Sequence, residues 1–475
     1  MKRFAVLLPL FLSIATLTAA CGGTIMGRPP EEIDMSAPHE GHAGHDGAAG
    51  QTVAALSCPE LIDPPSDAPV REFKLQAAVT PLELNDGTRS EAWTFNGSTP
   101  GPELRVTEGD RVIVKLTNVD IEAGVSIHWH GVVLPCSQDG VPGVTQDAVW
   151  PGGTFTYSFI AHHPGTYWYH SHQQSSQQAK RGLIGRLIVE PKVDPFAYDR
   201  DYAVALQELN EKHRLTNGGK GGLALKAAPG ETVRLRLVNA FDEAQHMGVS
   251  GAEFRVASID GNDLNGPTPL RNEWIPVGGG QRYDLLIKMP NSGQVAVYSR
   301  EHADWRIALG AGPEPDELPK AAGTFDFTAY GEHKEDGVTA DMSIDRTYEL
   351  ELGPITINGK GGHHIPPMFV KEGEWVKLRI KHRLGSDHPM HLHGHVFKIV
   401  TKNGKPLTGS PIYADSVLMF KGDEYEVVFQ ANNPGLWMLH CHNLGHAAAG
   451  MTMMLNYEGV TTPFRVGTKS GNLPD

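Results

Sequence analysis

Several features that often dominate a sequence are scarce in this one, and each scarcity narrows the possible function. Basic residues are outnumbered, with 41 Lys and Arg against 55 Asp and Glu, so the formal charge is −14. Nucleic-acid binding depends on clustered positive charge, and this balance argues against that class of partner. Cysteine is also rare, with 4 residues in 475. Each of these cysteines can therefore have a separate role.

Long apolar segments are absent after the first twenty residues, so we expect no membrane-spanning helix. Residues 1–20 combine a short basic start, an apolar run interrupted by Pro9, and small residues, which is typical of a secretory signal. Cys21 follows at once, and Leu17–Cys21 resembles a bacterial lipobox, with Thr18 where leucine is usual. The sequence predicts an exported protein, either a cell-envelope lipoprotein anchored to the membrane through Cys21 or a periplasmic or extracellular protein.

The segment from 21 to 66 has few apolar runs and is rich in Gly, Ala, Pro and acidic residues. This composition predicts a flexible tether without a packed core. Within it, His39, His42 and His45 occupy every third position. A mobile histidine tract of this kind can hold a metal ion loosely. A solvated linker that carries histidines by chance explains the tract equally well.

Long helical periodicity is also missing, whereas 54 Gly and 34 Pro indicate many turns and favour a β architecture. A turn followed by alternating apolar and polar residues, typical of a half-buried strand, occurs at Gly109–Val114, Gly230–Leu235 and Gly373–Leu378. The spacing of this repeat suits β-sandwich domains. We therefore expect an all-β chain with three sandwich domains, at residues 67–193, 194–338 and 339–475.

A longer repeat relates the first and third of these domains. Residues 164–172 read PGTYWYHSH and residues 434–442 read PGLWMLHCH, with Ser171 in the place of Cys441. The first domain therefore keeps the histidine pair and lacks the thiolate. We expect the two segments to form equivalent strands.

The strand that ends in His440, Cys441 and His442 is expected to serve two sites. Side chains alternate along a strand, so the two histidines point to one face and the cysteine to the other. The Cys441 thiolate, the His446 imidazole and the Met451 thioether are a soft donor set suited to copper. This strand is thus expected to carry electrons from one metal centre to another.

Closely spaced histidines occur in four segments of the outer domains. Imidazoles are costly to bury in numbers without partners, and metal coordination would supply those partners. The segments are His128–Trp129–His130, His170–Ser171–His172, His388–Pro389–Met390–His391–Leu392–His393, and His440–Cys441–His442 with His446.

These segments resemble the four copper motifs of the multicopper oxidases, in the same order along the chain. The resemblance implies three cupredoxin-like Greek-key β-sandwich domains and four copper ions. It implies a type 1 copper bound by His388, Cys441 and His446, with Met451 as a weak axial ligand. It also implies a type 2 copper and a type 3 pair, the first bound by His128 and His391 and the second by His130, His170, His172, His393, His440 and His442.

The same resemblance implies the reaction. Electrons from a donor would enter at the type 1 copper, pass through Cys441, and reduce O₂ to water at the other three coppers. Asp139 matches an acid that assists O₂ reduction in the family, although a simple Asp-Gly turn is the alternative. Cys58 and Cys136 remain as a candidate disulfide, and two isolated thiols are the alternative.

The leading hypothesis for function is a laccase-like oxidase of phenols or aromatic amines. The alternative is a metallo-oxidase of Cu(I), Fe(II) or Mn(II), involved in copper tolerance. An electron-transfer protein would need only the type 1 ligands and would leave the other histidines unexplained. Zinc is a poor match for a shared His-Cys-His strand followed by a methionine.

Overall fold

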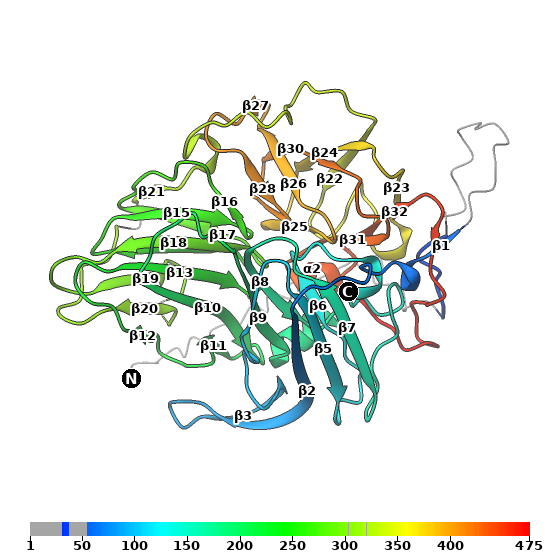
Figure 1. The fold of residues 1–475 in the computed structure, drawn as a ribbon, viewed down its shortest axis with the longest axis horizontal. Helices are drawn as coiled ribbons and strands as arrows, with labels where there is room; N and C mark the ends of the chain where they lie inside the picture. The colour runs from blue at the N-terminus through cyan, green and yellow to red at the C-terminus, as the bar shows by residue number, and fades with distance from the viewer. Residues whose placement is uncertain (1–30, 38–54, 303, 320) are drawn as a thin grey trace, which may run out of the picture.

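The computed structural model of the chain describes residues 31–37, 55–302, 304–319 and 321–475. The expected signal at 1–20, the lipidation candidate Cys21, and the tract of His39, His42 and His45 lie outside these residues. The described part is almost entirely β, which confirms the expected fold class (Figure 1). Its α-helices are short, α1 (Ser175–Arg181) and α2 (Leu444–Ala448), and none of its helices is long and apolar enough to cross a bilayer.

The first pair of sheets has strand orders β3-β2-β5-β7 and β4-β9-β8-β6. A short 3-10 helix, η2, follows β6 in the chain, and α1 follows β8. The bounds are β2 (Val70–Glu83), β3 (Arg89–Phe95), β4 (Leu104–Thr107), β5 (Arg111–Asn118), β6 (His128–His130), η2 (Cys136–Gln138), β7 (Thr154–Ile160), β8 (Gly165–His170) and β9 (Ile184–Glu190).

The middle pair of sheets has orders β11-β10-β13-β18-β15-β16 and β12-β20-β19-β14-β17-β21. Its strands are β10 (Arg200–Leu209), β11 (His213–Thr216), β12 (Leu223–Leu225), β13 (Thr232–Asn239), β14 (Gln245–Ser250), β15 (Phe254–Ile259), β16 (Asn262–Asp263), β17 (Glu273–Val277), β18 (Arg282–Lys288), β19 (Val295–Ser299), β20 (Arg306–Leu309) and β21 (Gly323–Thr324), followed by η3 (Phe327–Ala329).

The third pair has orders β22-β24-β30-β26-β27, with β28 also paired to β26, and β23-β32-β31-β25-β29. Its elements are β22 (Arg346–Leu352), η4 (Gly362–His364), β23 (Met368–Val370), β24 (Trp375–His382), β25 (His388–Leu392), β26 (Phe397–Lys402), β27 (Lys405–Pro406), β28 (Ile412–Ala414), β29 (Ser416–Met419), β30 (Glu424–Gln430), β31 (Leu436–Cys441) and β32 (Thr452–Tyr457). Strand β33 (Val460–Thr461) follows and lies outside these two sheets.

The threefold sequence repeat corresponds to one strand in each pair of sheets: β5, β13 and β24. Each of these strands pairs parallel with the strand that opens its domain, and antiparallel with a later strand. In β5 the alternating residues Val112, Val114 and Leu116 are fully buried. Alternation places every second side chain in the core, so the same sequence pattern forms the same element three times.

Two parts of the expected tether are attached to the third domain. Ile33 exchanges backbone hydrogen bonds with Val466, at 2.7 and 3.0 Å. Strand β1 (Leu56–Ser57) pairs parallel with β33 and leads into a 3-10 helix, η1 (Cys58–Glu60). The prediction of a flexible linker over 21–66 is therefore wrong for residues 31–37 and 55–66. These short stretches pair with the C-terminal part of the chain, as an isolated bridge and as a separate two-stranded sheet, and composition does not reveal such contacts.

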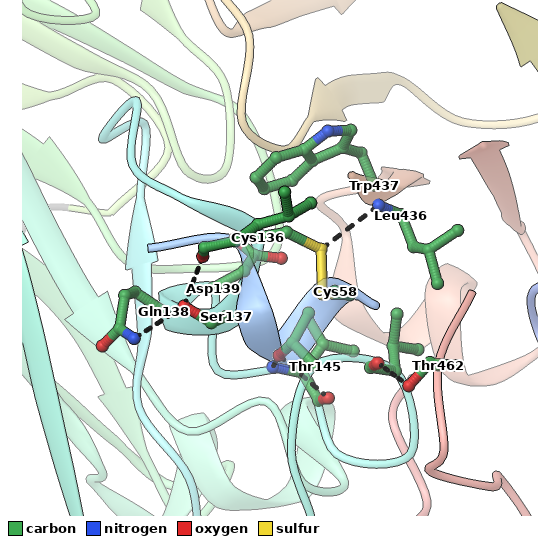
Figure 2. Close-up of a disulfide and its surroundings, with 12 residues drawn as sticks. Cys58, Cys136, Ser137, Gln138, Asp139, Thr145, Leu436, Trp437 and Thr462 are labelled. Atoms are coloured by element: carbon green, nitrogen blue, oxygen red, sulfur yellow. Dashed lines mark hydrogen bonds between the residues drawn. A yellow bond between two sulfur atoms is a disulfide. The ribbon is translucent and has the colours of Figure 1, made fainter. Parts of the chain in front are cut away.

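Cys58 and Cys136 form a disulfide, with an S–S distance of 2.07 Å across 78 residues of sequence. Figure 2 shows the bond beside strand β31, where the backbone N–H of Leu436 donates to Sγ of Cys136 at 3.3 Å. Cys136 begins η2, and Asp139 follows η2 directly. The disulfide therefore ties the segment that holds Asp139 to a chain segment paired with the third domain.

Replacing both cysteines with serine is expected to lower the free energy of unfolding. The unfolded chain would regain the loop-closure entropy of a 78-residue loop, about 4 kcal/mol. Guanidinium unfolding of the copper-free double variant Cys58→Ser, Cys136→Ser measures this change. The reduced wild-type protein is the matched control, since it should unfold at the same midpoint as the variant. Equal midpoints for the variant and the oxidised wild type would contradict the expectation.

Candidate metal centres

Two antiparallel strand pairs carry the histidine segments. In the first domain β6 pairs with β8, and His128 lies opposite His170. In the third domain β25 pairs with β31, and His391 lies opposite His440. Opposed residues of antiparallel strands project from the same face of the sheet. Each strand pair therefore presents its histidines together, and Figure 1 shows the two pairs near the centre of the molecule.

The histidines of the two domains meet in one buried cluster. His128 stacks on His393 with ring centroids 3.9 Å apart, and His130 stacks on His391 at 3.8 Å. These contacts join the first domain to the third. The histidine cluster consists of eight buried residues: His128, His130, His170, His172, His391, His393, His440 and His442.

Four residues of the histidine cluster orient their ring nitrogens in the same way. Nδ1 of His128, His170, His391 and His440 each lies 2.9–3.0 Å from a backbone carbonyl oxygen, to which it donates. Nε2 of the first three is buried and has no hydrogen-bond partner. Buried polar atoms are rarely left unpaired. Nitrogen lone pairs that converge without protein partners fit metal ions, and imidazole is a suitable ligand for copper.

His395 provides a contrast within the same segment. Its Nδ1 lies 3.1 Å from the carbonyl oxygen of His393, and its Nε2 lies 2.7 Å from the hydroxyl of Tyr457. Both nitrogens therefore have partners inside the protein. His395 has the contacts of a packed core residue, unlike the members of the histidine cluster.

Burial favours the neutral form of most imidazoles in the histidine cluster. Burial lowers the pKa of His130, His170, His172, His393 and His442 well below the usual value, and neighbouring imidazoles add to this effect. Burial likewise lowers the pKa of His440 to about 3. A neutral imidazole is the form that binds a metal. The site is thus ready to accept cations without first losing protons.

A second group of donors lies on the other side of β31. Sγ of Cys441 is 3.6 Å from Nδ1 of His388 and 3.6 Å from Nδ1 of His446. Met451 is fully buried, and its carbonyl oxygen accepts from the backbone N–H of Cys441 at 3.0 Å. Burial raises the pKa of the Cys441 thiol well above its usual value. The thiolate therefore needs a bound cation, and its two imidazole neighbours suit a copper ion.

Strand β31 joins the two groups of donors covalently. Cys441 lies opposite Met390 in the register, while His440 lies opposite His391 of the histidine cluster. Adjacent residues of a strand point to opposite faces. The structure thus places Cys441 with His388 and His446, and places His440 and His442 with the cluster.

Asp139 lies against rings from both domains. Its carboxylate oxygens are 3.2 Å from Nδ1 of His128 and 2.9 Å from Nδ1 of His393. The side chain is buried, with 1% of its surface exposed. An acid in this position can accept a proton from either ring or hold the ring orientation.

The resemblance to the multicopper oxidases implies two half-reactions, oxidation of a donor and reduction of O₂. Asp139→Asn is expected to slow the O₂-dependent half by about 10²- to 10⁴-fold, the usual contribution of a positioned acid or base. The amide keeps the size of the side chain but removes the proton acceptor. Anaerobic reduction of the thiolate centre should proceed at the wild-type rate, because Cys441 does not contact Asp139. Stopped-flow measurement of the two half-reactions separates these effects. Equal slowing of both halves would contradict a role confined to the cluster.

Sequence reasoning missed Asp415 and Arg282, which lie beside the cluster. Asp415 contacts His391 and His130, and Arg282 of the middle domain binds Asp415. One signal was available for Asp415: it is the single charged residue in the mostly apolar stretch Ile412–Met419, where it separates β28 from β29. No local pattern identifies Arg282, because its contacts depend on how the three domains meet.

Comparison with known proteins agrees with this geometry. Sequence profiles described as multicopper oxidase match residues 76–194, 168–302 and 335–459. Multicopper oxidase MmcO of Mycobacterium tuberculosis is 28% identical over 478 residues, which cover 86% of this chain and 91% of that protein. Laccase-1 of Botryotinia fuckeliana is 26% identical over 453 residues, which cover 78% and 79% of the two chains.

The crystal structure of a multi-copper oxidase from Pseudomonas thermotolerans superposes with a TM-score of 0.69 and 28% identity, covering 82% of this chain and 100% of that one. The fold that the two chains share, together with the thiolate–imidazole site and the histidine cluster of this chain, defines a copper-dependent oxidoreductase. The chain belongs to the multicopper oxidase family, whose members use O₂ as the electron acceptor.

Proposed function

We propose that this chain oxidises phenols or aromatic amines, one electron at a time, at a type 1 copper bound by His388, Cys441, His446 and Met451. The histidine cluster would hold the other three coppers, as a type 2 ion and a type 3 pair. When bound, the four coppers would pass four electrons from four donor molecules to O₂, which with four protons gives two waters. The observation that carries the proposal is the set of unpaired Nε2 atoms that converge in the histidine cluster, on the side of β31 opposite to Cys441.

Residues of the chain would serve two functions: electron entry at the thiolate site and proton handling at the histidine cluster. His446 is the half-exposed member of the thiolate site, and its Nε2 lies 3.4 Å from the hydroxyl of Ser386 in an exposed loop. An electron donor can therefore reach His446 from solvent. From Cys441 the flanking residues His440 and His442 offer a short covalent route into the cluster. Asp139 would hold or move protons at Nδ1 of His128 and His393.

Acidic residues near His446 favour the second candidate, oxidation of Cu(I), Fe(II) or Mn(II). Asp242 and Glu243 of the middle domain act on His446 electrostatically, partly offsetting the effect of its burial on the pKa. Burial raises the pKa of Asp387, next to His388, and the charge of Glu243 adds to this effect. These carboxylates would attract a metal cation. They would also accept a hydrogen bond from a phenol or an aromatic amine.

Oxygen uptake by the copper-loaded protein tests both candidates. Phenolic and aromatic amine donors are compared with Cu(I), Fe(II) and Mn(II) at a fixed O₂ concentration, with and without added Cu(II). Faster turnover of the organic donors supports the first candidate, and faster turnover of the metal ions supports the second. The absence of oxygen uptake with any of these donors would refute the proposed reaction. Metal analysis should find four coppers per chain.

We also propose that the protein acts outside the cytoplasm. The basis is the signal expected at residues 1–20, and the Cys58–Cys136 disulfide fits an oxidising compartment. The membrane would be contacted only through a lipid on Cys21. Mass spectrometry of the mature N-terminus distinguishes lipidated Cys21 from simple cleavage. A mature protein that retains residues 1–20 would overturn the proposal.

A further inference from the structure

Arg282 lies where the three domains meet, and its side chain is fully buried. It begins β18 of the middle domain. Its Nη1 and Nη2 donate to the two carboxylate oxygens of Asp415, in the third domain, at 2.9 and 2.6 Å. Its Nε donates to the carbonyl oxygen of Thr166, on β8 of the first domain, at 2.9 Å. One guanidinium group thus bonds to both of the domains that carry the histidine cluster.

Asp415 connects this arginine to two histidines of the cluster. Nδ1 of His391 lies 3.0 Å from the Asp415 carbonyl oxygen and 3.3 Å from its Oδ1. The same Oδ1 is 3.2 Å from Nε2 of His130. The hydroxyl of Ser416 contacts both Asp415 and His391: it lies 2.9 Å from Oδ1 of Asp415 and 3.2 Å from Nδ1 of His391. The position of the carboxylate therefore determines the surroundings of His391.

The charges of this buried group are arranged unequally. Asp415 pairs with Arg282 through both of its carboxylate oxygens, and its Oδ1 also faces the two histidines. Asp260 is the second acid beside Arg282, with its Oδ1 3.5 Å from Nη1. That oxygen accepts from the backbone N–H of Arg282 at 2.9 Å. Asp415 is thus the acid that takes both parallel hydrogen bonds of the guanidinium and also faces the histidines.

The backbone next to His130 leaves room for this contact. Gly131 adopts a φ of +83°, and a Cβ at this position would overlap the guanidinium of Arg282 and the carboxylate of Asp415. A left-handed glycine here allows the middle domain to approach the strand that carries His128 and His130. The contact between Arg282 and Asp415 therefore also depends on a glycine of the first domain.

We propose that Arg282 is a positioning residue for the copper bound by His128 and His391, although the middle domain supplies no ligand. Its planar fork holds the Asp415 carboxylate in one orientation. Asp415 in turn keeps the proton of His391 on Nδ1 and leaves Nε2 directed into the cluster. This inference rests on the proposed function, because it concerns the same copper site.

Arg282→Lys tests the inference, since lysine keeps the charge but cannot donate two parallel hydrogen bonds. We expect the intense thiolate–copper absorption to be unchanged. The type 2 copper should be partly lost or give an altered electron paramagnetic resonance spectrum, and oxygen reduction should fall about 10- to 100-fold. Arg234→Lys is the matched control: Arg234 is also a buried middle-domain arginine, and it binds Asp284 and Asp194, away from the histidines. That variant should keep the wild-type spectrum and rate.

A type 2 spectrum, copper content and oxygen rate equal to wild type in Arg282→Lys would overturn the inference and leave the proposed function intact. If that variant does not fold, Asp415→Asn takes its place, because the amide keeps the shape but loses the charge. An unaltered type 2 spectrum in Asp415→Asn would likewise overturn the inference. A wild-type protein that binds no type 2 copper would instead refute the proposed function, and the inference with it.

Discussion

Cys441→Ser is expected to abolish the intense visible absorption of the copper-loaded protein and to reduce donor oxidation on the order of a thousandfold or more, as expected for loss of an essential catalytic residue. Serine has nearly the size of cysteine, but its hydroxyl is a poor ligand for copper and gives no thiolate charge-transfer band. Sγ of Cys441 is the atom that both His388 and His446 approach, at 3.6 Å each. The variant would then lack the copper site at which electrons from the donor enter the protein.

Absorption spectroscopy and metal analysis check this result together. The variant should retain the three coppers of the histidine cluster, because His440 and His442 contact other rings of the cluster and not the group around Cys441. Copper content should therefore fall by one ion per chain, not by four. Persistence of the intense visible band in the serine variant would mean that another residue supplies the thiolate-like ligand, and the assignment of this site would fail.

His130→Ala is expected to have the opposite pattern: the visible absorption stays and oxygen reduction falls on the order of a thousandfold or more, as for an essential catalytic residue. His130 belongs to the histidine cluster, where it stacks on His391 at 3.8 Å. It does not contact Cys441. Anaerobic addition of a reducing donor should still bleach the band at the wild-type rate, while reoxidation by O₂ should be nearly absent.

His213→Ala is a suitable control for this experiment, since His213 lies on β11 of the middle domain and is not part of the cluster. It should keep the wild-type spectrum, copper content and rate of oxygen uptake. Loss of the visible band in His130→Ala would show that the two donor groups are not separate centres. Stopped-flow absorption with an oxygen electrode measures each of these quantities.

The histidine segments and Cys441 could be recognised in the sequence because their pattern is local. In β31, alternation along one strand already separates Cys441 from His440 and His442. The repeat of residues 164–172 and 434–442 indicated two equivalent strands, and both form, as β8 and β31. Short-range periodicity of this kind depends only on strand geometry, so it can be recognised in the sequence.

The surroundings of the ligands could not be predicted in the same way. Arg282, Asp415 and Thr166 lie more than a hundred residues apart and come from three domains. No periodicity links them, and an arginine at the start of a strand resembles any exposed arginine. Likewise, Ile33 and Leu56 occur in a segment whose composition suggests a free linker, yet they pair with Val466 and Val460.

The amino-acid sequence alone indicated the all-β class, the threefold strand repeat and the histidine segments that form the cluster, because each is a pattern of neighbouring residues. Tertiary structure decided how those histidines meet between the first and third domains, which carboxylates face them, and how Arg282 of the middle domain reaches them. The physical reason is that strand alternation acts over a few residues, whereas burial and ion pairing depend on which surfaces pack together.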